Sequence, residues 1–119
     1  MNGNDKVLLD SDVLVNYSKG FINLDEYFEQ YNSVCISVIT YMEILGYNFI
    51  NFQEEKLLKD IVSKIEIVNV NEIIVEKVIE IRKKYKIKIP DSIIFATAAF
   101  LNANFVSFNE KDFLKLRKA

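Results

Sequence analysis

The sequence contains no histidine among its 119 residues. This absence excludes Ser-His-Asp and Cys-His nucleophilic systems, histidine acid–base chemistry and histidine-ligated zinc. Cys35 is the only cysteine, so an internal disulfide is excluded and a buried strand position in a reducing cytoplasm is expected. An enzyme built from this chain would therefore depend on carboxylates and on metal ions that prefer oxygen ligands.

Long apolar runs, glycine and proline are also scarce. The longest apolar stretch, residues 93–101, is shorter than the ~18–20 residues needed to cross a bilayer, so no membrane partner is expected. The opening "MNGND" lacks the basic and apolar regions of a secretory signal, which predicts a cytoplasmic protein. The length and the absence of a linker predict a single domain over residues 1–119. A formal charge of −2 neither requires nor excludes a nucleic-acid partner.

Apolar residues follow an alternation of short strands and helices. Strands are expected at residues 6–9, 33–38, 64–70 and 104–108. Helices are expected at residues 13–20, 22–32, 40–50, 54–65, 71–86, 90–103 and 110–119. Apolar strands between helices predict an α/β protein, a three-layer α/β/α sandwich with a central parallel sheet of four to five strands. The aromatic residues are assigned mostly to its core, and none to base stacking.

Acidic residues recur where the expected strands end. Asp10 follows the first strand directly, Glu43 lies in the first turn of the helix after the second, and Asn109 follows the last. Parallel strands bring these positions to one edge, where ligands bind in open α/β sheets. Asp91 joins them if the helix opened by Pro90 begins at that edge.

Each acid also has a purely structural explanation. "TYME", Thr40 to Glu43, fits a capping box, Asp91 suits a helix N-terminus, and Asp12 and Asp112 could cap the first and last helices. Capping does not explain why a carboxylate follows a buried strand at Asp10, where its burial is costly. Clustered carboxylates repel one another, and a divalent metal would neutralise them.

Basic residues crowd the end of the helix before Asp91. The stretch "RKKYKIK" contains the candidate RNA contacts Arg82, Lys83, Lys84 and Lys86. Cations at a helix C-terminus are common for structural reasons alone, but these residues lead directly toward the acids and could hold a phosphate backbone.

Three segments together resemble the PIN-domain family, and within it the VapC-type toxins of bacterial toxin–antitoxin pairs. They are "LLDSDVLVNY", "ISVITYMEILGY" and "IKIPDSIIFATAAFLNANFVSFNEKDF", in the family's order and over nearly the whole chain. The resemblance implies a PIN-like fold and an endoribonuclease that uses Mg²⁺ or Mn²⁺. It also implies a small cognate antitoxin and a homodimer.

The resemblance further implies roles for individual residues. It suggests Asp10, Glu43, Asp91 and Asn109 as the catalytic set. Asp112 is added to the first three as a candidate metal ligand, and Ser11 and Ser107 match small hydroxyl residues that support the site. Asp12 stands where this subgroup commonly has asparagine, so it is a supporting residue whose role stays open.

The function expected is hydrolysis of RNA phosphodiester bonds by metal-activated water, which needs no histidine. One alternative is a catalytically weakened PIN-like domain that binds RNA or protein. A second is a haloacid-dehalogenase-like phosphatase, because Asp10 and Asp12 form a D-x-D motif after a buried strand.

Overall fold

The computed structural model describes residues 5–108, in which two helices lie between each strand and the next. The strands are β1 (Lys6–Leu9), β2 (Ser33–Ser37), β3 (Glu66–Val68) and β4 (Asn104–Val106). The helices are α1 (Ser11–Ser18), α2 (Asp25–Gln30), α3 (Val38–Leu45), α4 (Phe52–Val62), α5 (Glu72–Lys84) and α6 (Ile89–Leu101). The expected helix at 110–119 lies outside the described residues.

The described strands form one parallel sheet in the order β3-β2-β1-β4. Leu8 of β1 stands opposite Cys35 of β2 on one side and Phe105 of β4 on the other. Because all four strands run the same way, their carboxyl ends share one edge, called here the carboxyl edge. The predicted α/β fold with a central parallel sheet is confirmed.

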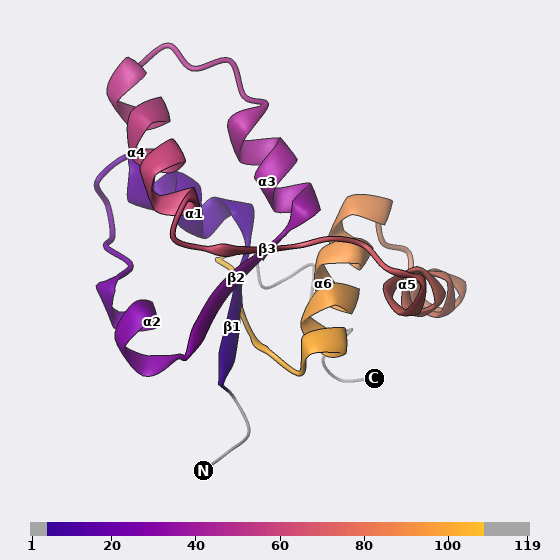
Figure 1. Ribbon diagram of the computed structural model, residues 1–119. Coiled ribbons are helices and arrows are strands. Elements are labelled where there is room, and N and C mark those ends of the chain that lie inside the picture. Colours follow the sequence, from indigo (N-terminus) through magenta and orange to yellow (C-terminus); the bar gives the residue numbers. More distant parts are fainter. Residues whose placement is uncertain (1–4, 109–119) are drawn as a thin grey trace.

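Alternate residues of β1 pack against different helical layers. Val7 and Leu9, both fully buried, join a core with residues of α1 and α4. Leu8 and Cys35 face the other way and pack against Ile94 of α6. Figure 1 shows α1, α2 and α4 on one side of the sheet, α6 on the other, and α5 packed outside α6. Each fully buried leucine contributes about 2 kcal/mol to this arrangement.

Helix α3 begins earlier than the sequence pattern indicated. Ser37 caps it, since its hydroxyl accepts a hydrogen bond from the Ile39 backbone N–H at 3.1 Å. The capping box offered by Thr40 and Glu43 as a structural alternative is therefore absent. Thr40 is buried within the helix, and its hydroxyl has no hydrogen-bond partner among residues 5–108. Glu43 lies in the second turn rather than the first.

The helix also ends earlier, at Leu45 rather than Ile50. The residue after the helix is Gly46, and a Cβ at this position would lie 2.5 Å from the Met42 carbonyl oxygen. Any residue with a side chain would therefore clash there, so glycine allows the helix to end at this point. Of the aromatic residues assigned to the core, several lie on the surface instead, including Tyr47 at 68% exposure and Phe52 at 74%. No helix within residues 5–108 has both the length and the apolar character needed to cross a membrane.

Cys35 is buried in β2, and its thiol donates a hydrogen bond to the Glu66 carboxylate at 3.2 Å. Burial, followed by this hydrogen bond and the charge of Glu66, raises the thiol pKa to about 12. At pH 8 only about one thiol in ten thousand is then ionised.

We expect iodoacetamide to leave the native protein unmodified at pH 8 and to alkylate Cys35 in urea. Rapid alkylation of the native protein, measured by mass spectrometry, would contradict this environment.

Candidate active site

Asp10 joins the end of β1 to the start of α1. Its side chain caps α1 by accepting a hydrogen bond from the Ser11 backbone N–H at 2.8 Å. Its other carboxylate oxygen accepts from the Ser107 hydroxyl, also at 2.8 Å. Asp10 is only 7% exposed, and these two bonds offset the cost of burying its charge. The Asp10 carboxylate is thus held in a fixed position at the carboxyl edge.

Asp12 does not take the capping position that the sequence offered it at the start of α1. It does not cap α1, because Asp10 does; Asp12 lies in the first turn of that helix. One of its carboxylate oxygens accepts a hydrogen bond from the Phe108 backbone N–H at 3.1 Å. Asp10 and Asp12 therefore hold two consecutive residues after β4, Ser107 and Phe108, against the start of α1.

Glu43 lies within electrostatic reach of two other candidate acids. Partial burial raises the pKa of its carboxyl group, and the charges of Asp10 and Asp91 raise that pKa further. Asp91 is in the first turn of α6, as predicted, although α6 begins at Ile89 and Pro90 is its second residue. The parallel sheet thus brings together three acids separated by up to 81 residues in the chain, from Asp10 to Asp91.

The three acids approach one another without forming a compact ligand set. Within residues 5–108, no group of three or more acidic or cysteine side chains is arranged to hold a metal ion. Mg²⁺ nevertheless suits this donor set, because it usually keeps several waters and takes one or two carboxylates. The electrostatic penalty on Glu43 is also of the kind that a nearby cation relieves. Asn109 and Asp112 lie outside the described residues.

The candidate RNA contacts lie at the end of α5 and in the loop that leads to α6. Arg82, Lys83, Lys84 and Lys86 are all exposed. Four ion pairs join charged side chains in the described part of the chain, and none includes these four residues. Together with Tyr85, Ile87 and Lys88, Arg82 and Lys86 line a hollow of about 410 Å³.

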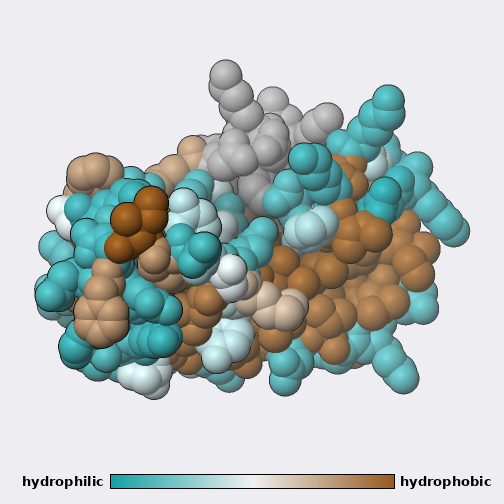
Figure 2. Space-filling view, turned by 90° about the horizontal axis from the view of Figure 1, so that it is seen from above, coloured by the Kyte–Doolittle hydropathy of each residue, from teal (hydrophilic) through white to brown (hydrophobic). Residues whose placement is uncertain are grey.

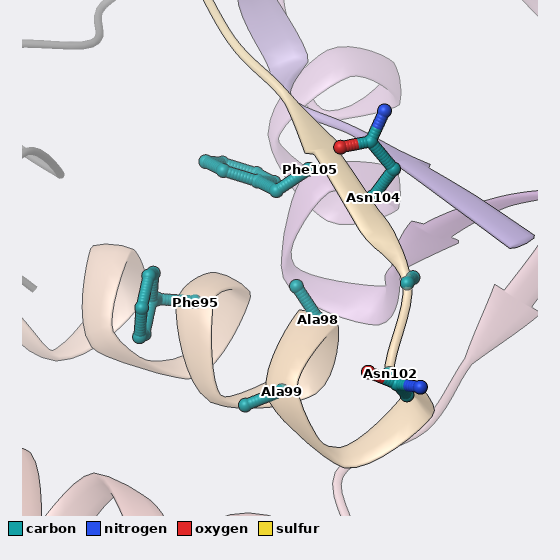
Figure 3. A pocket seen from close by; sticks show the side chains of 7 residues that line it. Phe95, Ala98, Ala99, Asn102, Asn104 and Phe105 are labelled. Carbon is teal, nitrogen blue, oxygen red and sulfur yellow. The ribbon is translucent and has the colours of Figure 1, made fainter. Parts of the chain in front are cut away.

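Another hollow, of about 360 Å³, lies between α6 and β4 and is lined by residues that include Phe95, Ala98 and Phe105 (Figure 3). It adjoins the C-terminal end of α6 and the first residue of β4, so it is at the edge where the strands begin. None of the candidate acids lines it. This hollow is therefore separate from the candidate active site.

Comparisons with known proteins agree with this fold. The family model of the PIN domain matches residues 7–119. A toxin–antitoxin complex from Klebsiella pneumoniae contains a chain that is 30% identical, with a TM-score of 0.74 over 90% of this chain and 89% of that one. The chain therefore belongs to the PIN-domain family.

Two further solved structures share the fold at lower identity. VapBC2 from Rickettsia felis, bound to a DNA fragment from its promoter, is 21% identical with a TM-score of 0.78, over 92% of each chain. VapBC-1 from nontypeable Haemophilus influenzae is 20% identical with a TM-score of 0.76, over 95% of this chain and 93% of that one. None of the curated proteins matches this chain significantly.

The raised pKa of Glu43 makes its charge unfavourable for folding. A carboxyl group with a higher pKa in the folded state binds its proton more tightly there, so its ionisation near neutral pH lowers stability. Glu43 is solvent-exposed, so water screens much of this effect. In EDTA at pH 7, we expect Glu43→Gln to raise the melting temperature by only about 1–2 °C. The gain should shrink as the pH falls through the raised pKa of Glu43 toward 4.5, where the wild-type side chain becomes protonated.

Glu29→Gln is the matched control, because Glu29 is exposed on α2, away from the three acids. It should leave the melting temperature unchanged. A Glu43→Gln protein that melts no higher than wild type at pH 7 would show that the three acids do not repel one another in solution.

Proposed function

We propose that this chain is a metal-dependent endoribonuclease and the toxin of a toxin–antitoxin pair, acting as a single domain of residues 1–119 in the cytoplasm. Its membership of the PIN family supports nuclease chemistry and removes the phosphatase-like alternative. The observation that carries the proposal is the match of the PIN-domain family model to residues 7–119. The raised pKa of Glu43, caused first by burial and then by the charges of Asp10 and Asp91, supports the site, because two acids that the family resemblance pairs with a metal act on the third.

The chain's own residues supply positioning and charge in the proposed reaction. Hydrolysis forms a bond from a water oxygen to phosphorus and breaks one phosphodiester P–O bond. Asp10, held by Ser11 and Ser107, would keep a fixed carboxylate at the carboxyl edge, with Glu43 and Asp91 completing the acidic face. Mg²⁺ or Mn²⁺, when bound by these acids, supplies water activation and charge neutralisation. Asn109 and Asp112 are proposed as further members of this site.

RNA binding would rest on the cations beside α6. Arg82, Lys83, Lys84 and Lys86 carry positive charge that no ion pair neutralises within residues 5–108. Lys86 is five residues before Asp91 in the chain, so a phosphate backbone held by these cations would lead toward the acids.

Two protein partners are part of the proposal. A cognate antitoxin is supported by the 30% identical chain, which comes from a toxin–antitoxin complex. A second copy of this chain is implied by the family resemblance. Helix α5 is consistent with a protein contact, because its apolar residues Ile73, Val75 and Ile79 are exposed. Figure 2, seen from above the carboxyl edge, shows apolar side chains gathered over α5 and α6.

Loss of one acid tests the metal site directly. We expect Asp91→Asn to abolish Mn²⁺ binding in a calorimetric titration and to lower the rate of RNA cleavage by about 100-fold or more. Asp25→Asn is the matched control, since Asp25 begins α2 and is exposed. Unchanged cleavage by Asp91→Asn would exclude this site. Mn²⁺ binding without cleavage of RNA by the wild-type protein would favour the weakened, non-catalytic alternative.

The cations can be tested by the salt dependence of RNA cleavage. For the double variant Arg82→Gln/Lys86→Gln, we expect a higher KM with kcat retained. The slope of log affinity against log salt should fall by about 1.4, because each phosphate contact to a single strand contributes about 0.7. The control is Lys56→Gln/Lys59→Gln, which removes two cations that are ion-paired on α4. If both double variants raise KM equally, Arg82 and Lys86 make no specific phosphate contact and act only through the net charge of the protein.

A further inference from the structure

A third hollow, of about 270 Å³, opens beside the acids and is enclosed by α1, α3 and α4. Ser11 and Glu43 form part of its lining, so it is continuous with the candidate active site. Val15, Ile44 and Leu58 give it apolar walls. A group held in this hollow would therefore lie within reach of whatever the acids act upon.

Two aromatic rings stand at this hollow, just after the end of α3. Tyr47 and Phe49 both line it and meet edge to face, with ring centroids 5.4 Å apart and an interplanar angle of 74°. Phe49 is half-buried and packs against the core, whereas Tyr47 is 68% exposed. The half-buried ring of Phe49 thus supports the exposed ring of Tyr47, which is the arrangement of a stacking platform.

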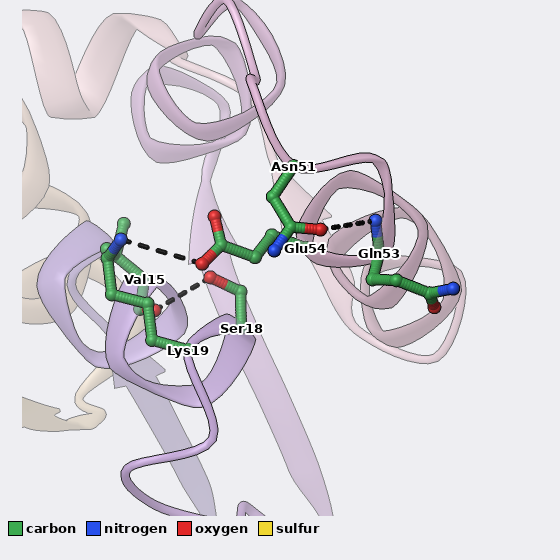
Figure 4. A network of polar contacts seen from close by, with 6 residues as sticks. All are labelled: Val15, Ser18, Lys19, Asn51, Gln53 and Glu54. Carbon is green, nitrogen blue, oxygen red and sulfur yellow. Dashed lines mark hydrogen bonds and ion pairs between the residues drawn. The ribbon is translucent and has the colours of Figure 1, made fainter.

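Polar groups line the same hollow. Lys19, directly after α1, and Glu54 of α4 form an ion pair at 3.6 Å, and Figure 4 shows their side chains meeting between the two helices. Ser18, which is buried, donates its hydroxyl hydrogen to the Val15 carbonyl oxygen at 2.7 Å, so its own oxygen can accept a further bond. The hollow therefore offers a cationic donor and two kinds of acceptor beside an aromatic surface.

We propose that this hollow receives one unpaired base of the RNA, from a nucleotide next to the cleaved phosphodiester. The base stacks on Tyr47, and its polar edge faces the Lys19–Glu54 ion pair. This inference rests on the proposed nuclease function and adds a specificity site to it.

The chemistry of the lining favours a base over an apolar protein side chain. A base combines a flat π-face with hydrogen-bond donors and acceptors along one edge, and sequence-specific recognition of RNA uses unstacked bases of this kind. An apolar side chain would leave the ion pair and the Ser18 oxygen facing a group that cannot bond to them. A phosphate at the acids also requires a place for the base attached to the same nucleotide.

The experiment is a double-mutant cycle on cleavage of a short single-stranded RNA, at each position flanking the cut. One arm is Tyr47→Ala and the other is removal of a single base from the substrate. At one position, we expect base removal to raise KM roughly five- to tenfold with wild-type protein and less than twofold with Tyr47→Ala. Tyr47→Phe keeps the ring, so base removal at that position should still raise KM roughly five- to tenfold. Glu54→Gln should change the base preference at that position.

Phe52→Ala is the matched control, because Phe52 is an exposed aromatic residue of α4 that does not line the hollow. It should leave the cycle unchanged. Additive effects of Tyr47→Ala and base removal at every position would overturn the inference. So would a Tyr47→Ala protein that binds the antitoxin more weakly but cleaves RNA with unchanged KM.

Failure of the nuclease proposal is separable from failure of this one. If wild-type protein cleaves no RNA in Mn²⁺, the nuclease function is wrong. The same cycle is then measured as binding of the fluorescently labelled RNA and its abasic versions to the wild-type and Tyr47→Ala proteins. Coupling between Tyr47 and one base would support base binding even then, and additivity would overturn it.

Discussion

The central position of β1 is the constraint on which the site depends. It pairs in parallel with β2 on one side and β4 on the other, so the ends of three strands meet at one edge. The apolar side chains of β1 point alternately into two cores, which fixes its register against a shift of one residue. Asp10 immediately follows this strand, and its position is therefore set by the two cores beneath it.

The two acids of the D-S-D motif, Asp10 and Asp12, each bind one residue of the segment that follows β4. Asp10 accepts from the Ser107 hydroxyl and Asp12 from the Phe108 backbone N–H, so both bind the segment that leaves β4. Asp10 also caps α1 through the Ser11 N–H. A carboxylate that is costly to bury thus ties the first strand to the last described strand, and the same bonds orient it for chemistry.

The strands and their common edge could be predicted because the apolar runs of β1 and β2, residues 7–9 and 34–36, are short and end at a polar residue, Asp10 and Ser37. The start of α3 could not, because Ser37 and Thr40 both have the chemistry of an N-cap, and only the burial of Thr40 within the helix separates them. The exposure of Tyr47 was missed for a similar reason. A tyrosine after a helix has the same local sequence whether it packs inward or stands at the mouth of a hollow.

The hollow beside Glu43 was beyond sequence reasoning, because its walls come from α1, α3 and α4, and no local pattern records how three helices pack. The location of the hollow is nevertheless determined by the sheet, because α1 follows β1 and α3 follows β2, so both helices begin at the carboxyl edge. The carboxyl edge therefore places acids, an aromatic platform and an ion pair in one continuous region. Cations that join no ion pair within residues 5–108 lie at the end of α5 and in the loop that leads to α6. For the proposed nuclease, these would be separate means of holding the reacting bond, one base and the flanking backbone, so substrate choice could change at the helices while the acids stay fixed by β1.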